Sequence, residues 1–208
     1  MKTILFQGDS ITDSERDRNN ETDLGNGYAN LVASQLGFEN PLKFKFINRG
    51  IGGNRVIDIY SRIKCDIINL KPDVLSITVG VNDVWQKFAL QNGLSVCKFR
   101  QIYSMLIEEV REALPDIRIM LLEPFFIEGT VTREKMDKFA PVKEMAKTVR
   151  EICNEYNLKF ISLQDEFDKA TEIAPAEYWS IDGIHPTYAG HELIKREWIK
   201  VFKEYIKE

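Results

Sequence analysis

The chain has 208 residues, 44% of them hydrophobic and 29% charged, which favours one globular domain over residues 1–208 with a sizeable buried core. Its 28 Lys and Arg and 32 Asp and Glu residues are mixed along the chain and give a net charge of −4, which argues against a nucleic-acid partner. No apolar run approaches the roughly 20 residues that cross a bilayer, and polar sequence begins at Gln7 without a signal-peptide core, so we expect a cytoplasmic protein with no membrane partner.

Short apolar runs rich in β-branched and aromatic residues alternate with longer segments of helical period. This alternation is typical of repeated βαβ units, so the sequence predicts a single three-layer α/β/α domain with a five-stranded parallel sheet flanked by helices. Each expected strand is apolar enough to be buried on both faces. The expected strands are Thr3–Gln7, Phe44–Asn48, Val74–Val79, Ile117–Leu122 and Phe160–Leu163.

Amphipathic helices are predicted between and after the strands. Apolar residues recur three and four positions apart within residues 24–36, 56–67, 99–114, 142–156 and 193–205, as on helices that lie against a sheet. The three cysteines are odd in number and widely spaced, which indicates neither a disulfide framework nor a zinc cluster. We expect Cys65, Cys97 and Cys153 to be packing residues in a reducing compartment.

Four loops carry the polar residues and glycines that are candidates for a functional site. In an open parallel sheet, ligands bind outside the carboxyl ends of the strands, where these loops lie. Residues 8–13 follow the first expected strand, residues 48–54 the second and residues 80–83 the third, while residues 182–186 precede the last helix.

Ser10 stands directly after the first strand, where its hydroxyl can project from the rim of the sheet. The alternative is a simple turn in which Ser10 caps a helix. The spacing of Asp182 and His185 favours a catalytic role for Ser10 over a cap, because a serine nucleophile needs a general base and an acid that orients the base. Ser10, His185 and Asp182 supply these three groups.

The sequence predicts neither a metal nor an organic cofactor. His191, the other histidine, falls six residues after His185 with no His-Glu-x-x-His pattern and no cysteine nearby. We therefore interpret His191 as structural.

Donors for a developing oxyanion are available in two of the loops. Gly52 and Gly53 allow the backbone to approach a ligand, and Asn82 follows a buried strand and can direct its amide into the same crevice. A phosphate-binding loop is the competing interpretation of these glycines, but the chain has neither a dinucleotide-binding glycine pattern nor a P-loop. A tight strand-to-helix turn also explains Gly50 and Gly52.

These four blocks resemble the SGNH or GDSL-type hydrolases, in which a Gly-Asp-Ser serine, a glycine, an asparagine and an Asp-x-x-His pair occur in this order. The resemblance implies a flavodoxin-like fold with Ser10 as nucleophile, His185 as base and Asp182 as its orienting acid. It also implies an oxyanion hole formed by the Ser10 N–H, the Gly53 N–H and the Asn82 side chain. The serine that usually precedes the family's glycine is replaced here by Gly52, which makes Gly53 the better match.

Within this family the chain looks most like the acetyl-xylan-esterase type, which implies removal of acetyl groups from sugar hydroxyls. Trp85 and Trp179 are then candidates for flat apolar faces under a sugar ring, with burial in the core as the alternative for each. The stretches that carry this likeness are residues 8–13, 25–28, 81–85, 123–129 and 185–186.

We therefore expect a serine esterase that hydrolyses small acyl esters of carbohydrates, acetyl esters above all, through an acyl-enzyme intermediate. One alternative is a lysophospholipase or thioesterase of the same family. Another, from a different class, is a catalytically inactive α/β module that binds a sugar. The expected partner is a small ester or an acetylated saccharide, and the sequence leaves open whether the protein is a homo-oligomer.

Overall fold

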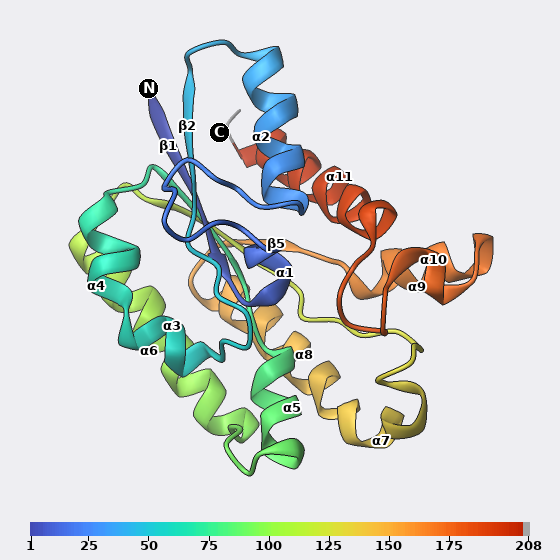
Figure 1. The fold of residues 1–208 in the computed structure, drawn as a ribbon. Helices are drawn as coiled ribbons and strands as arrows, with labels where there is room; N and C mark the ends of the chain where they lie inside the picture. The colour runs from blue at the N-terminus through green and yellow to red at the C-terminus, as the bar shows by residue number, and fades with distance from the viewer. Residues whose placement is uncertain (206–208) are drawn as a thin grey trace.

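The computed structural model describes residues 1–205 and contains a parallel five-stranded sheet with the strand order β2-β1-β3-β4-β5. This confirms the predicted α/β fold with helices on both faces of the sheet (Figure 1). The strands are β1 (Lys2–Gly8), β2 (Phe44–Asn48), β3 (Val74–Thr78), β4 (Arg118–Leu122) and β5 (Lys159–Ile161).

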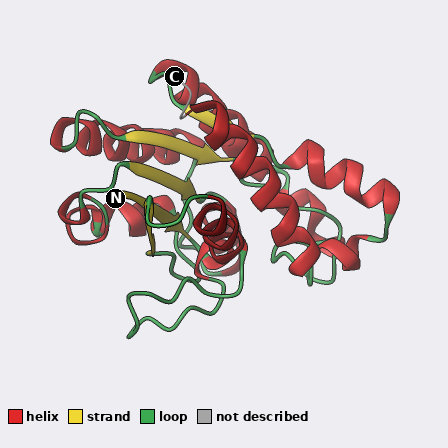
Figure 2. Ribbon diagram, turned by 90° about the horizontal axis from the view of Figure 1, so that it is seen from above, coloured by secondary structure: helices red, strands yellow, loops and turns green. Residues whose placement is uncertain are grey.

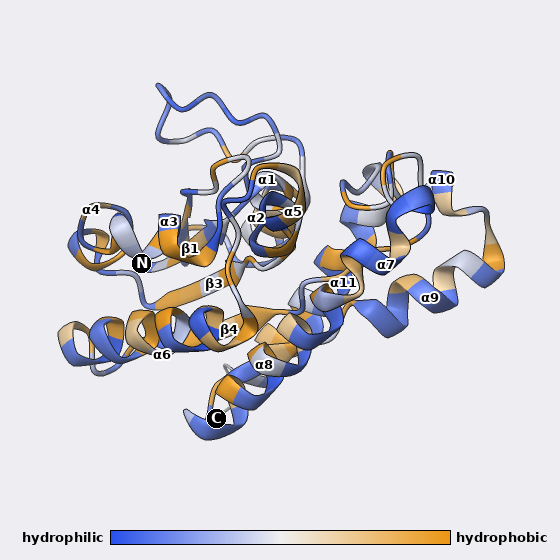
Figure 3. Cartoon of the chain, turned by 90° about the horizontal axis from the view of Figure 1, so that it is seen from below, coloured by the Kyte–Doolittle hydropathy of each residue, from blue (hydrophilic) through white to orange (hydrophobic). Residues whose placement is uncertain are grey.

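Side chains alternate between the two faces of the sheet, and each face is covered by helices. Leu5 of β1 belongs to one apolar cluster, whereas its neighbours Ile4 and Phe6 belong to the other. This alternation follows from the two-residue period of a strand and explains why the strands are hydrophobic throughout. Figure 2 shows the strands between the two helical layers, and Figure 3 shows the contrast between hydrophobic strands and amphipathic helices.

The first layer of helices packs against the face that carries Leu5. It comprises α3 (Val56–Ser61), α4 (Ile63–Asp66), α5 (Val81–Ala89), α6 (Val96–Ala113), α7 (Met136–Phe139) and α8 (Pro141–Glu155), with the short turns η1 (Ile68–Leu70) and η2 (Arg133–Lys135) beside them.

The second layer covers the opposite face, and in it α2 and α11 lie side by side (Figure 1). Trp198 of α11 is fully buried there, and its indole N–H donates to Ser76 Oγ of β3 at 2.9 Å. The helices on this side are α1 (Ser10–Asp13), α2 (Tyr28–Glu39), α9 (Gln164–Ile173), α10 (Ala176–Trp179) and α11 (Tyr188–Tyr205).

The structure departs from the expected elements at the last strand. β5 ends at Ile161 rather than at Leu163, because the chain turns there around the carboxylate of Glu123. Glu123 Oε2 accepts hydrogen bonds from Ser162 Oγ at 3.0 Å and from the backbone N–H groups of Leu163 and Gln164 at 2.7 and 3.0 Å. Helices α5, α7, α9 and α10 were not predicted, and the helix expected from residue 24 begins at Tyr28.

The cysteine prediction is only partly correct. Cys153 is buried in the core, but Cys65 and Cys97 are exposed, so these two are not packing residues. Within residues 1–205, no helix combines the length and apolar character needed to cross a membrane.

The sheet topology places one crevice at the carboxyl ends of β1 and β3. The chain continues from β1 to β2 on one side and then returns to β3 on the other, and ligands of open α/β sheets bind where the strand order reverses in this way. The loops after β1, β2 and β3 all open onto this edge.

Candidate active site

The turn after β1 presents Ser10 at the edge of the sheet. Asp9, and not Ser10, caps the short helix α1: its Oδ1 accepts the backbone N–H of Ile11 at 3.0 Å. This leaves the Ser10 hydroxyl free for other partners. Burial raises the pKa of Asp9 from 3.8 to about 6, although the bond from Ile11 opposes the shift.

Three side chains from distant parts of the sequence form a continuous hydrogen-bonded chain. The Ser10 Oγ lies 2.9 Å from the Nε2 of His185, and the His185 Nδ1 lies 2.7 Å from the Oδ2 of Asp182. With a proton on Nδ1 directed at the carboxylate, Nε2 is the acceptor for the serine hydroxyl. This arrangement can transfer a proton from the hydroxyl to the imidazole when the oxygen attacks an electrophile.

A network of backbone contacts holds the loop that carries His185. Ser180 Oγ donates to the carbonyl of His185 and accepts the N–H of Gly183, both at 2.9 Å. The carbonyl of Gly183 in turn accepts the N–H of Ile127 at 2.9 Å. The loop after β4 therefore supports the loop before α11 through Ile127.

The hydrogen bond between His185 and Asp182 favours the protonated form of His185 and the ionised form of Asp182. The hydrogen bond that the ring of His185 donates to Asp182 raises the pKa of His185 above its ordinary value of 6.5, although partial burial opposes this. Partial burial would raise the pKa of Asp182, but the hydrogen bonds from the ring and backbone of His185 outweigh it and lower this pKa. Asp182 is thus held as the anion that stabilises a protonated His185.

The loop after β2 and the start of α5 bring further donors to the same edge. A Cβ added to Gly52 would lie 3.8 Å from the Ser10 Cβ, so this loop is adjacent to the serine. Gly53 adopts a φ of +82°, a left-handed conformation that favours glycine. Its N–H has no hydrogen-bond partner among residues 1–205, whereas the Gly52 N–H is occupied by Asp13.

Asn82 lies in the first turn of α5, next to this loop. Its Nδ2 donates to the carbonyl of Asn54 at 3.2 Å, and an amide has a second hydrogen to offer. Asp83, the next residue, is buried and accepts the N–H of Val56 at 3.2 Å, which fixes the start of α3 against α5. Burial raises the pKa of Asp83 to about 8.

A cavity of about 660 Å³ opens beside Ser10 and His185. Polar and charged residues outnumber apolar ones in its lining, which includes Ile11, Asp13, Glu15, Ile181, Tyr188 and His191. Ile181 and Tyr188 are 66% and 85% exposed, which places them at the open side of the cavity. The cavity thus has the size and mixed lining of a small-molecule site.

The two tryptophans occupy different environments. The ring centroid of Trp85 lies 6.3 Å from that of His185, and its other neighbour is Phe139 in a T-shaped contact at 5.8 Å. Trp85 packs against the first apolar cluster and Trp179 against the second, where its indole N–H donates to the carbonyl of Ala174 at 3.2 Å. Neither tryptophan lines the cavity beside Ser10. A role for either in substrate binding stays a prediction.

His191 is buried, and its Nδ1 accepts the N–H of Tyr28 at the start of α2 at 3.2 Å. Burial lowers its pKa to about 4, so the ring is neutral near pH 7. It therefore has the structural contact that we predicted, and it also lines the cavity. In the part of the chain that the structure describes, no cluster of His, Cys, Asp and Glu side chains could hold a metal ion.

Three residues that contact the backbone of the site loops were not predicted from the sequence. Asp13 and Gln86 contact the loop of Gly52 and Gly53, and Ser180 contacts the loop of His185. Of these three residues, only Asp13 lies in a stretch of sequence that resembles the family, residues 8–13.

Comparison with known proteins places the chain in a hydrolase family. Residues 6–193 match the GDSL-like lipase/acylhydrolase family, and the chain belongs to it. It is 33% identical to an acetylxylan esterase of Geobacillus stearothermophilus over 95% of this chain and 92% of that protein. The chain is accordingly a carboxylic ester hydrolase.

The fold of the chain is also similar to solved structures of such hydrolases. A candidate GDSL-like lipase from Parabacteroides merdae superposes with a TM-score of 0.93 at 37% identity, covering 97% of this chain and 95% of that one. The Geobacillus stearothermophilus acetylxylan esterase Axe2 superposes with a TM-score of 0.86 at 30% identity, covering 96% and 93%. Structures of Axe2 include two catalytic mutants in which a serine and an aspartate are replaced by alanine.

Proposed function

We propose that this protein removes small acyl groups, chiefly acetyl, from the hydroxyls of carbohydrates through an acyl-enzyme formed on Ser10. The observation that carries the proposal is the unbroken contact from Ser10 through His185 to Asp182 at the wall of a cavity. No metal or organic cofactor takes part in this mechanism.

In the first half of the reaction, Ser10 Oγ attacks the ester carbonyl and its proton passes to His185 Nε2. The tetrahedral intermediate collapses when the C–O bond to the sugar breaks and the imidazolium returns the proton to the leaving oxygen. In the second half, water attacks the acyl-serine, His185 takes its proton, and the acid is released as Ser10 regains its hydrogen. Asp182 stays ionised and stabilises the imidazolium in both halves.

The negative oxygen of each tetrahedral intermediate needs donors that are already in position. We assign these to the backbone N–H groups of Ser10 and Gly53 and to the second hydrogen of the Asn82 amide. The unpaired Gly53 N–H and the proximity of its loop to Ser10 support this assignment.

Two observations support an acetylated sugar as the substrate. The relative with 33% identity is an acetylxylan esterase. The cavity also has its open side at the exposed Ile181 and Tyr188, which leaves room for a leaving group larger than the acyl part.

The test is a panel of acetylated xylose sugars, lysophospholipids and acyl-thioesters, assayed with the wild-type protein and with Ser10→Ala as the blank. We expect serine-dependent hydrolysis to be fastest on the sugar acetates. Faster turnover of the lipid or the thioester would assign the protein to those activities, and sugar binding without any turnover would indicate an inactive module.

A further inference from the structure

The proposed oxyanion donor Gly53 belongs to a Gly-Gly pair, the dipeptide with the greatest backbone freedom. A donor contributes fully to catalysis only when its direction is fixed before the charge develops. Neither Gly52 nor Gly53 has a side chain to restrict it, so groups outside the pair must hold the N–H in place.

One such group is Asp13, at the end of the short helix that begins with Ser10. Its Oδ2 accepts the N–H of Gly52 at 2.8 Å, and its side chain is 9% exposed. The Asp13 N–H donates to the carbonyl of Asp9 at 2.8 Å, so the carboxylate is rigidly connected to the turn that carries the serine. A side chain at Gly50 would collide with the backbone nitrogen of Asp13, which shows how closely the two loops pack.

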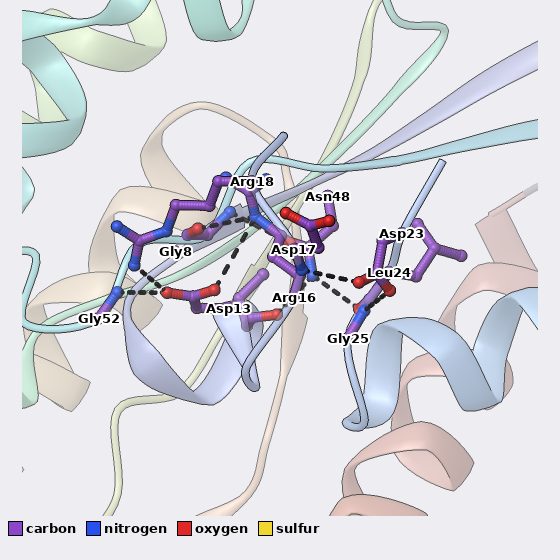
Figure 4. Close-up of polar contacts among 12 residues, drawn as sticks. Gly8, Asp13, Arg16, Asp17, Arg18, Asp23, Leu24, Gly25, Asn48 and Gly52 are labelled. Carbon is purple, nitrogen blue, oxygen red and sulfur yellow. Dashed lines mark hydrogen bonds and ion pairs between the residues drawn. The ribbon is translucent and has the colours of Figure 1, made fainter. Parts of the chain in front are cut away.

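The charge of Asp13 is compensated by two arginines. Arg18 Nη2 lies 2.5 Å from Oδ2, and Arg16 Nε lies 3.9 Å from Oδ1 (Figure 4). Arg16 is buried, and its Nε also donates to the carbonyl of Gly50 at 3.1 Å. A bare carboxylate next to the oxyanion hole would repel the negative charge of the transition state, and the guanidinium groups offset that repulsion.

A second anchor comes from α5, the helix that carries Asn82. The Nε2 of Gln86 donates to the carbonyl of Gly53 at 2.6 Å. Asp13 therefore fixes the peptide before the one that contains the Gly53 N–H, and Gln86 fixes the peptide after it. Each anchor stands on an element that also supplies an oxyanion donor, since α1 begins with Ser10.

We propose that Asp13 and Gln86 are positioning residues that set the direction of the Gly53 N–H, and that Arg18 and Arg16 make the anionic anchor compatible with the oxyanion hole. The inference rests on the proposed role of Gly53. It assigns to Asp13 an effect on the rate of the chemical step and not on substrate binding, because the misdirected donor acts on charge present only in the transition state.

The test compares kcat and KM for 4-nitrophenyl acetate in Asp13→Ala, Asp13→Asn and the control Asp17→Ala. Asp17 lies in the same segment and carries the same charge, but its Oδ1 accepts the exposed N–H of Asn19 instead. We expect Asp13→Ala to lower kcat by about 10- to 100-fold with KM changed less than threefold. Asparagine retains an acceptor oxygen, so Asp13→Asn should recover most of this loss, and Asp17→Ala should match the wild type.

The arginine contribution is tested by a double substitution. Arg18→Gln should lower kcat several-fold, because Asp13 then faces the oxyanion with less compensation. In the Asp13→Asn background the same change should have no further effect. An equal loss in both backgrounds would overturn the charge-compensation part of the inference.

Wild-type kcat in Asp13→Ala, or an equal loss in the alanine and asparagine variants, would overturn the role of Asp13. If Asp13→Ala fails to fold by circular dichroism, Gln86→Ala decides, with an expected fall in kcat of about 10-fold and KM unchanged. These outcomes differ from failure of the proposed function, in which the wild-type protein itself would show no hydrolysis that depends on Ser10.

Discussion

Asp182 holds His185 with both of its carboxylate oxygens. Oδ1 accepts the backbone N–H of His185 at 2.8 Å, and Oδ2 lies 2.7 Å from the Nδ1 of the same residue's ring. One side chain therefore fixes the backbone and the ring plane together. The three-residue spacing is what allows this, because a carboxylate can reach its own loop's N–H groups only across a tight turn.

This contact predicts the pH dependence of the reaction. Only neutral His185 can accept the serine proton, so activity should rise with pH through the pKa of His185. The hydrogen bond that the His185 ring donates to Asp182 raises that pKa above 6.5. Asp182→Asn should shift the midpoint to lower pH and lower kcat by about 10⁴. A kcat/KM profile from pH 5 to 9 measures both effects, and a profile that is flat between pH 5 and 8 would contradict a histidine base.

Ser10→Ala should abolish hydrolysis and leave the fold intact, because Ser10 is half-buried at a loop edge and Asp9 makes the helix cap. Loss of a nucleophile lowers kcat by about 10⁴- to 10⁶-fold. A fluorophosphonate probe should label the peptide that contains Ser10 in the wild type, as read by mass spectrometry. A label on Ser14 or Ser180 would show that the nucleophile is another serine.

Asn82→Ala should lower kcat by about 10²- to 10³-fold with little change in KM, because an oxyanion donor acts on charge that appears after binding. Steady-state kinetics on 4-nitrophenyl acetate separates the two constants. A variant with an altered KM and an unchanged kcat would make Asn82 a binding or structural residue.

Asp83 predicts a pH effect on stability rather than on catalysis. Burial raises its pKa to about 8, against 3.8 when unfolded, so between these values the folded protein binds more protons. Stability contributed by this group therefore falls as pH rises, by up to about 1.4 kcal/mol per pH unit.

Asp83→Asn keeps an acceptor for the Val56 N–H and removes the titration. The melting temperature of the variant relative to the wild type should be higher at pH 8 than at pH 4. Equal differences at the two pH values would show that Asp83 titrates normally.

The strands could be predicted from the sequence because a strand buried on both faces leaves a continuous apolar run. The positions of Ser10, Asn82 and His185 could be predicted because each lies beside such a run or in a loop bounded by glycine and proline. Helix α5 was missed because its first turn was interpreted as loop. The contact between Asp13 and Gly52 joins residues 39 apart, and no local pattern encodes it.

The last prediction separates the two tryptophans that the sequence grouped together. Trp85 lies next to the ring of His185, so Trp85→Ala should raise KM or lower kcat on acetylated xylose sugars. Trp179 donates to Ala174 and packs in the second apolar cluster, so Trp179→Ala should lower the melting temperature. The free energy of unfolding falls by about 3 to 5 kcal/mol when a fully buried aromatic is replaced by alanine, and it should fall by less for the half-buried Trp179.

Both variants are measured with acetyl, butyryl and octanoyl esters of one leaving group as well as with the sugar acetates. An enzyme with a long acyl groove gains from every methylene, by about 0.8 kcal/mol each, whereas a site made for acetyl does not. We expect kcat/KM to fall from acetyl to octanoyl in the wild type and in Trp179→Ala. Faster turnover of octanoyl than of acetyl would refute the small-acyl preference, and wild-type sugar-ester kinetics in Trp85→Ala would limit that residue to packing against Phe139.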